Sequence, residues 1–387
     1  MINLSNLDIS KKRVLIRLDL NVPIKNNIIQ SDSRILAALP TIELALKKNA
    51  KVMIMSHLGR PQKEQYTKEL SLFPIYEYLK KKIKYTKINF SDNYLNGIKI
   101  NTGELCILEN VRFNKGEGKN DISLSKKYAS LCDIFVMDAF GTSHRIESST
   151  YGVAQFAPIS CAGPLLKSEL TALSQALKNP ARPMIAVVGG SKVSTKFNIL
   201  NSLVNIADNI IVGGGIANTF IAINHPVGNS LYEPEFIDKA NILTKKNNIL
   251  IPVDSRVGTH FSEKSSAIVK KINEINKNEE IMDFGDQTIK NMISLLHTAK
   301  TILWNGPVGV FEFPNFRIGT KMLAQTIANS NAFSIAGGGE TLSVIDMFNI
   351  KKDISYISTG GGAFLKFLEG GTLPTVKILQ KRSLKKI

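Results

Sequence analysis

Residues 185–196 read I-A-V-V-G-G-S-K-V-S-T-K, and this stretch gives the first indication of the fold. The apolar residues 185–188 are typical of a buried parallel strand. Gly189 and Gly190 allow a sharp turn and a close approach of the backbone to a ligand. Lys192 and Lys196 follow where we expect a helix to begin, with both ammonium groups on one face. A strand end, a helix N-terminus and two cations together suit a phosphate group.

The stretch alone leaves a second interpretation open, an ordinary strand–turn–helix with two solvated lysines. Neither G-x-x-x-x-G-K-[ST] nor G-x-G-x-x-G occurs in the chain, so this is not a P-loop or a dinucleotide fingerprint. Repetition favours the phosphate interpretation, because glycine clusters also follow four further strand candidates. These are residues 209–212, 301–304, 332–336 and 354–358, while a fifth candidate, 249–253, precedes Asp254. Such clusters at strand ends suit a nucleotide or polyphosphate.

In the first half of the chain, the segments that follow the strand candidates contain arginines where those of the second half contain glycine clusters. The strand candidates there are residues 13–18, 51–55, 105–108 and 133–137. Arg60, Arg112 and Arg145 lie in the loops after three of them, and Arg34 lies in the first turn of a predicted helix over 33–49 with Ser33 as N-cap. The carboxyl ends of parallel strands line the ligand crevice of an open sheet. The arginines therefore predict a shared site for a carboxylate or phosphate.

Length and composition indicate a two-domain globular protein. The chain has 387 residues, beyond the size at which a single core stops growing, and 43% of them are hydrophobic. No apolar run approaches a membrane span, and residues 1–19 lack the apolar segment of a signal peptide. Three cysteines without a C-x-x-C pair argue against a disulfide framework and favour a reducing, cytoplasmic setting.

The formal net charge of +17 has two interpretations. One is nucleic-acid binding, which such a charge would drive. The other is lysines scattered over the surface by composition bias. We favour the second, because the basic runs are short, as in 80–82 and 381–386, and no aromatic residues alternate with them. We therefore expect no membrane and no specific nucleic-acid partner.

These patterns predict an α/β protein of two lobes, an arginine-rich one followed by a glycine-rich one. Further helices are predicted over residues 70–81 and 168–177, and the second of these falls between the lobes as a candidate hinge. The basic tail after Pro374 is a candidate to pack back on the first lobe. Trp304 is predicted to lie in the core.

Several long motifs, spread over essentially the whole chain, resemble those of phosphoglycerate kinases. They are R-L-D-L-N-V-P (17–23), S-H-L-G-R-P (56–61), E-N-V-R-F (109–113), D-A-F-G-T-S-H-R (138–145), G-G-S-K-V-S-T-K (189–196), W-N-G-P-V-G-V-F-E (304–312) and the glycine triplets 337–339 and 360–362. The resemblance implies two Rossmann-like three-layer α/β/α lobes with parallel sheets, joined by a hinge helix. It implies a glycerate-binding domain over 1–167, a nucleotide-binding domain over 168–370 whose hinge helix is 168–178, and a tail over 371–387 that returns to the first domain.

The function implied is reversible, Mg²⁺-dependent phosphoryl transfer in glycolysis, from 1,3-bisphosphoglycerate to ADP, giving 3-phosphoglycerate and ATP, by a monomer that bends at its hinge. Carried over by motif, the glycerate site would comprise Asp19, Asn21, Arg34, His57, Leu58, Gly59, Arg60, Arg112 and Arg145. The nucleotide site would comprise Lys192, Lys196, Gly213, Gly214, Asn305, Glu312, Gly338, Gly339, Glu340 and Thr341. Glu340 would also meet the metal.

Two positions depart from the family pattern. The usual G-G-G-D-[ST] reads G-G-G-E-T here, and Glu340 is one methylene longer than the aspartate at the magnesium. Its contact with Mg²⁺ is therefore either direct or bridged by water. After Arg145 the family often continues A-H, whereas this chain has Ile146 and Glu147. We expect Glu147 to face solvent, because a carboxylate at an anion site would oppose the charge of the substrate.

The chemistry expected is positioning and charge neutralisation, because the attacking oxygen of a carboxylate or phosphate is already ionised and needs no general base. Arg34 and Lys196 are the residues predicted to stabilise the transferring phosphoryl group, with Lys192 a weaker candidate. Gly361, in the second triplet, would donate its backbone N–H to the same group. His57 is predicted to bind the glycerate or else to pack its loop.

Overall fold

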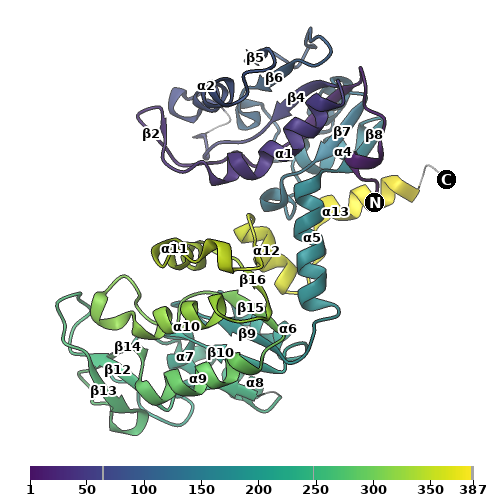
Figure 1. The fold of residues 1–387 in the computed structure, drawn as a ribbon. Coiled ribbons are helices and arrows are strands. Elements are labelled where there is room, and N and C mark those ends of the chain that lie inside the picture. The colour runs from purple at the N-terminus through teal and green to yellow at the C-terminus, as the bar shows by residue number, and fades with distance from the viewer. Residues whose placement is uncertain (63–64, 247, 385–387) are drawn as a thin grey trace. The chain divides into compact units, whose positions relative to one another are not determined.

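The computed structural model describes residues 1–62, 65–246 and 248–384. The chain divides into two compact units, unit 1 with Met1–Thr171 and Thr372–Ile387, and unit 2 with Ala172–Gly371. Each unit is built on a parallel sheet with helices packed on it (Figure 1). The predicted α/β class with parallel sheets is confirmed. Residues 385–387, the end of the predicted tail, lie outside the described part of the chain.

The sheet of unit 1 has the strand order β5-β6-β4-β1-β7-β8, and all its pairings are parallel. The strands are β1 (Arg13–Arg17), β4 (Lys51–Met55), β5 (Ile88–Ser91), β6 (Leu105–Leu108), β7 (Ile134–Met137) and β8 (Ile159–Ala162). Four of them, β1, β4, β6 and β7, are almost wholly buried, as expected for parallel strands covered by helices on both faces. The predictions missed β5, β8 and the hairpin of β2 (Ile24–Lys25) and β3 (Ile28–Ile29).

Of the two helices predicted in unit 1, the first begins at Ser33 as predicted and ends two residues early, and the second begins three residues late. The helices of this unit are α1 (Ser33–Lys47), α2 (Phe73–Lys82), α3 (Ile122–Ser130) and α4 (Val153–Phe156), with α13 (Pro374–Leu384) from the end of the chain. Asp32, and not Ser33, is the N-cap residue of α1, and its carboxylate accepts a 2.6 Å hydrogen bond from the Tyr78 hydroxyl. Residues 68–70 form a separate 3-10 turn, so α2 starts later than expected.

The last helix, α13, packs on β8 and α4 of the first unit (Figure 1). Its Thr375, Ile378 and Leu379 side chains are buried. The Thr375 hydroxyl donates a 3.0 Å hydrogen bond to the carbonyl oxygen of Ser143. The Arg382 guanidinium donates a 2.6 Å bond to the carbonyl oxygen of Ala157. The end of the chain therefore supports the loop that also carries Arg145.

The sheet of unit 2 has the order β11-β10-β9-β15-β16-β17, again with parallel pairings. Its strands are β9 (Met184–Val188), β10 (Asn209–Val212), β11 (Asn248–Leu250), β15 (Thr301–Asn305), β16 (Phe333–Ala336) and β17 (Tyr356–Ile357). The chain runs outward from β9 through β10 to β11, and later continues from β15 on the other side of β9. The direction of strand addition therefore reverses between β9 and β15, the position at which ligands bind in open sheets.

The helices of unit 2 follow its strands. They are α6 (Phe197–Leu203), α7 (Gly214–Ile221), α8 (Ile237–Thr244), α9 (Asp286–Thr298), α10 (Ile318–Ala328), α11 (Gly339–Met347) and α12 (Gly361–Leu368). The predicted strand over 249–253 is wrong in its second half, because β11 ends at Leu250. A separate antiparallel sheet follows, with β12 (Asp254–Gly258) between β13 (Ile268–Lys271) and β14 (Glu280–Phe284).

Helix α5 (Pro164–Leu177) contains the boundary between the two units, which falls after Thr171. Its first turn is held by the buried Asp138, whose Oδ1 accepts a 2.8 Å hydrogen bond from the Leu166 N–H. The other carboxylate oxygen accepts a hydrogen bond from the Thr41 hydroxyl of α1. Burial raises the pKa of Asp138 to about 7. One carboxyl group thus joins the end of β7, α1 and the start of α5.

Candidate active site

The predicted glycerate residues lie in the segments that follow β1, β4, β6 and β7, at one edge of the unit 1 sheet, except Arg34, which lies in the first turn of α1. Arg34 Nη1 contacts Asp19 Oδ1 at 3.1 Å and the carbonyl oxygen of Asn21 at 2.9 Å. The Asn21 side-chain oxygen accepts a 2.9 Å bond from the Gly59 N–H. Arg112 donates to the carbonyl oxygen of Gly59. Arg34 and the segments after β1, β4 and β6 are therefore joined in one chain of contacts.

Glu147 joins Arg145 to this group, and the expectation that Glu147 faces solvent is wrong. Its Oε1 lies 3.6 Å from Arg112 Nη2 and 3.6 Å from Arg145 Nη1, and only 12% of its side chain is exposed. Burial lowers the pKa of Arg112, the Glu147 charge opposes that shift, and Arg145, Arg17 and Arg60 reinforce it. The arginines lie close enough together that an anion between them is favoured. We call Arg34, Arg60, Arg112 and Arg145 the arginine cluster.

His57 lies beneath the arginine cluster and contacts Arg17, a residue that the sequence analysis did not select. Arg17 is fully buried, and its Nη2 lies 3.3 Å from His57 Nδ1. Because a guanidinium only donates hydrogen bonds, Nδ1 must accept and the proton resides on Nε2. Burial, and then the charges of Arg17, Arg112, Arg145 and Arg34, lower the pKa of His57 well below its usual value. His57 is therefore a neutral hydrogen-bond donor.

Asn110 is a second residue that the predictions missed, and it fixes the loop containing Leu58. Its Nδ2 donates to the carbonyl oxygens of Leu58 at 2.8 Å and Leu70 at 2.9 Å. Its Oδ1 accepts from the Leu58 N–H at 3.3 Å and the Arg112 N–H at 3.1 Å. An Arg at the end of an apolar strand (Arg17) and an Asn two residues after a strand (Asn110) are the sequence signals that could have indicated both residues.

Lys196 lies in unit 2 where the strand order reverses. Its Nζ donates to the carbonyl oxygens of Gly189 at 2.6 Å and Asn305 at 3.2 Å, at the ends of β9 and β15. Burial lowers the pKa of this ammonium to about 8, although the negative charge of Glu340 opposes the shift. The expected shared helical face is wrong, because α6 begins only at Phe197 and the exposed Lys192 lies in the preceding loop.

Glycine is required by packing at the turns around Lys196. A Cβ on Gly189 would lie 1.7 Å from the carbonyl oxygen of Pro307, and one on Gly306 would lie 2.2 Å from the carbonyl oxygen of Gly189. Gly213 and Gly214 are equally restricted, with added Cβ atoms 2.5 Å from Val308 Cα and 2.7 Å from Gly190 O. The backbones of the three turns are therefore in direct contact.

Gly339 and Gly361 are different, because a Cβ added at either would meet nothing within 4 Å. They are the first residues of α11 and α12, and the first N–H groups of a helix have no acceptor within that helix. Packing within the fold does not require glycine at these two positions. Close approach of a ligand would require it.

Asn305, Gly338 and Thr341 form a connected group beside Lys196. Asn305 is buried, and its Nδ2 donates a 2.7 Å bond to Gly337 O. Its Oδ1 is buried without a hydrogen-bond partner among the described residues, and so remains available as an acceptor. The Thr341 hydroxyl accepts from the Gly306 N–H at 2.8 Å. Gly338 has φ of +101°, a conformation that favours glycine.

Glu340 is exposed in the first turn of α11, and its charge acts on Lys196. The described residues contain no group of three or more His, Cys, Asp or Glu side chains that could hold a metal ion. Mg²⁺ is commonly held by one or two carboxylates together with substrate phosphates, and a single exposed carboxylate in the first turn of α11 fits that pattern. Glu312 is also exposed, after β15, and no side-chain contact of it is described.

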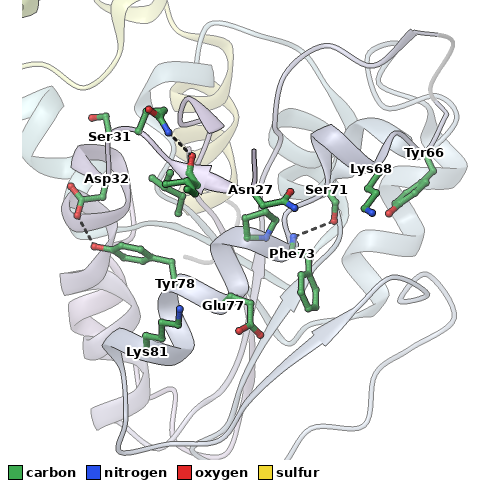
Figure 2. Close-up of a pocket in the computed structure, with 14 residues that line it drawn as sticks. Asn27, Ser31, Asp32, Tyr66, Lys68, Ser71, Phe73, Glu77, Tyr78 and Lys81 are labelled. Atoms are coloured by element: carbon green, nitrogen blue, oxygen red, sulfur yellow. Dashed lines mark hydrogen bonds between the residues drawn. The ribbon is translucent and has the colours of Figure 1, made fainter. Parts of the chain in front are cut away.

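A cavity of about 810 Å³ opens elsewhere on unit 1, between the β2–β3 hairpin and α2 (Figure 2). Figure 2 shows Tyr78 directed at Asp32 on one side and Ser71 at the backbone of Phe73 on the other. The described residues that line it include none of the predicted site residues. The arginine cluster is therefore distinct from this cavity.

Comparison with known proteins identifies the family. A family model described as phosphoglycerate kinase matches residues 4–371. A phosphoglycerate kinase of Buchnera aphidicola subsp. Acyrthosiphon pisum (strain 5A) is 67% identical over 378 residues, 98% of this chain and 97% of the relative. A phosphoglycerate kinase of Buchnera aphidicola subsp. Schizaphis graminum (strain Sg) is 66% identical over 379 residues, 98% of each chain.

Two solved structures share the fold. That of phosphoglycerate kinase from Coxiella burnetii has a TM-score of 0.95 at 50% identity and covers 98% of this chain and 99% of its own. That from Pyrococcus horikoshii OT3 has a TM-score of 0.83 at 32% identity and covers all of both chains. The motifs, the two parallel sheets and these matches agree, and the chain belongs to the phosphoglycerate kinase family.

Proposed function

We propose that the arginine cluster of unit 1 binds 3-phosphoglycerate or 1,3-bisphosphoglycerate and that the glycine-lined edge of unit 2 binds ATP or ADP. As a member of its family, the chain is a kinase that transfers a phosphoryl group to and from a carboxyl group in glycolysis. The observation that supports the glycerate site is the contact chain from Arg34 through Gly59 and Arg112 to Arg145. The nucleotide site is supported by the contacts of Lys196 with the carbonyl oxygens at the ends of β9 and β15. Four guanidinium groups at one sheet edge suit a small anion with both carboxylate and phosphate groups.

In the glycerate site, Asp19 and Asn21 orient Arg34, and the Gly59 loop orients Arg112. His57 donates through Nε2 to a substrate oxygen, and Arg60 and Arg145 neutralise the charge. The backbone of Leu58 is held by Asn110 and keeps this loop in position. These residues all lie within the proposed glycerate-binding domain over 1–167.

The nucleotide site is proposed to lie within the domain 168–370. There the turn at Gly213 and Gly214, which has no side chains, contacts the adenine base, and Glu312 contacts the ribose. Lys192, Asn305, Gly338, Gly339 and Thr341 surround the phosphates. Glu340 would hold Mg²⁺, which when bound neutralises phosphate charge and fixes phosphate geometry.

Catalysis is proposed to consist of positioning and charge stabilisation by Arg34, Lys196 and the N–H of Gly361. Lys196 is well suited, because two carbonyl oxygens fix its ammonium and burial removes water from it. Because the two substrates are assigned to different units, transfer also requires a hinge-bending step that brings them together and excludes water. The enzyme is proposed to act as a monomer in the cytoplasm, and the three free, buried cysteines support the cytoplasmic setting.

The proposal is tested by coupled assays of ADP phosphorylation by 1,3-bisphosphoglycerate, with and without Mg²⁺. We expect ATP formation only with Mg²⁺, and saturation by both substrates. A chain that forms no ATP, or that forms it from other acyl phosphates equally well, would contradict the assignment of the substrate. Unchanged activity after removal of Mg²⁺ by a chelator would contradict the role given to Glu340.

A further inference from the structure

The arginine cluster contains a carboxylate of its own. Glu147 Oε1 lies between Arg112 Nη2 and Arg145 Nη1, at 3.6 Å from each. The side chains of Glu147 and Arg112 are 12% and 16% exposed, so this is a mostly buried group of charges. The second oxygen, Oε2, is buried without a hydrogen-bond partner among the described residues. One acceptor oxygen of Glu147 therefore remains unused within the site.

The backbone of Glu147 is fixed. Its carbonyl oxygen accepts from the N–H groups of Thr150, Tyr151 and Gly152, which begin a short helical segment. Its own N–H donates a 3.2 Å bond to the Thr150 hydroxyl, and its side chain accepts from the Thr150 N–H. Glu147 can therefore leave the arginines only by rotation of its side chain, while its Cα stays where it is.

We propose that Glu147 is a specificity-determining residue, a resident counter-ion that holds the position between Arg112 and Arg145 until a more highly charged ligand displaces it. This proposal rests on the proposed function, because the displacing ligand is the phosphate or carboxylate group of the glycerate substrate. A monovalent anion gains little binding free energy from two guanidinium groups that are already paired with Glu147. A phosphate with two charges and three acceptor oxygens gains more from the same pair.

The proposal predicts that Glu147 weakens the binding of the substrate by an amount that can be measured. A substrate phosphate in this position either meets the Glu147 charge or must turn it away, and both weaken binding. Removing the charge while keeping the shape should therefore tighten binding of phosphate-bearing ligands. It should also make the site less selective, because chloride and other monovalent anions would then bind the free arginines.

The test is Glu147→Gln, which keeps the side-chain oxygen that caps the helical segment. Its matched control is Glu104→Gln, which removes one charge at the opposite, amino-terminal edge of the same sheet, where Glu104 pairs with Lys87 at 3.8 Å. Dissociation constants for 3-phosphoglycerate and for inorganic phosphate are measured by calorimetry at fixed low ionic strength. We expect Glu147→Gln to bind both roughly three- to tenfold more tightly, the change that an ion pair of this kind supplies. It should also be inhibited by chloride at several-fold lower concentration than the parent enzyme.

Equal or weaker binding of both ligands by a folded Glu147→Gln would overturn the proposal, because Glu147 would then orient the arginines and not compete for them. The same tightening in Glu104→Gln would also overturn it, as an effect of net charge alone. If Glu147→Gln does not fold, Glu147→Asp withdraws the carboxylate by one methylene and should tighten phosphate binding to a lesser degree; unchanged binding there overturns it. Failure of the proposed function is distinguishable, since it appears as a parent chain inactive with 1,3-bisphosphoglycerate, whereas inorganic phosphate still reports on Glu147.

Discussion

Lys196 shows how a single residue acquires a catalytic position from the ends of two strands. Its ammonium is fixed by the carbonyl oxygens of Gly189 and Asn305, and burial holds its pKa at about 8. We expect Lys196→Ala to lower kcat by ~10³-fold, the scale of effect seen when a cation is removed from a phosphoryl-transfer site. Steady-state kinetics in both directions measure this. Lys192→Ala is the control, with a smaller effect because Lys192 is exposed in the loop; near-normal kcat in Lys196→Ala would remove Lys196 from the chemistry.

The residues at strand ends could be predicted from the sequence, and the residues beneath them could not. Topology alone places Arg60, Arg112 and Arg145 at one edge of a parallel sheet. By contrast, the direction of the Arg17 side chain depends on Ser149, 132 positions away, and that of Glu147 depends on the exact path of its loop. Glu147 was expected to face solvent because a lone carboxylate would oppose the substrate, but two guanidiniums make its buried position favourable.

At the scale of elements, the turns of unit 2 contain two kinds of glycine. Gly339→Ala should keep the stability of the fold, because its new methyl group meets nothing and alanine favours a helix. It should nevertheless raise the KM for ATP at least about tenfold, since the methyl group stands where the phosphates are proposed to approach. Gly189→Ala should instead lower the free energy of unfolding by about 3 kcal/mol or more. Chemical denaturation and kinetics together separate the two, and a Gly339→Ala enzyme with unchanged KM would contradict the proposed phosphate site.

The carboxyl group of Asp138 joins three elements and predicts a pH dependence. Burial raises its pKa from 3.8 to about 7, so between these values the folded protein binds a proton that the unfolded chain has released. Its contribution to stability is thus complete below about pH 4 and is lost as the pH rises through 7. We expect Asp138→Asn, which cannot ionise, to gain stability relative to the parent as the pH rises from about 4 to 7, by on the order of 4 kcal/mol in total, and no more above that. Thermal unfolding at several pH values tests this, and a difference independent of pH would contradict it.

The exact ends of the helices and strands depend on local contacts and on proline positions, which the period of the hydrophobic residues does not indicate. The strands 51–55, 105–108 and 209–212 were predicted to the residue, because buried parallel strands are short apolar runs. The strand over 249–253 was overextended, since Pro252 cannot continue a ladder and the next residues pair antiparallel in another sheet. The predicted start of α6 is also wrong, because α6 begins only at Phe197. The loop over 189–196 is instead fixed by the hydrogen bonds from Lys196 Nζ to the carbonyl oxygens of Gly189 and Asn305.

At the scale of the whole molecule, unit 1 is completed by the end of the chain. Leu379 of α13 is fully buried. We expect Leu379→Ala to lower the stability of unit 1 by about 2–5 kcal/mol through loss of buried area and the cavity that remains. It should also raise the KM for 3-phosphoglycerate, because Thr375 supports the Ser143 loop beside Arg145. The exposed neighbour Gln380→Ala is the control in thermal unfolding, and equal melting temperatures for both variants would contradict a structural role for α13.

In the described part of the chain, no helix combines the length and the apolar character that crossing a membrane requires. The domain boundary, the hinge motion and the monomeric state remain predictions. The family was identifiable from sequence because its motifs are strand ends and turns, where only a few residue types satisfy both backbone geometry and ligand chemistry.

The position of α13 has a consequence for biosynthesis. A ribosome must translate the 200 residues of unit 2 before it produces the helix that packs on β8 and α4. At the ~5–20 residues per second of translation, the first unit waits roughly 10–40 seconds with that surface uncovered. The surface of β8 and α4 that α13 covers therefore stays exposed until residues 374–384 have been synthesised.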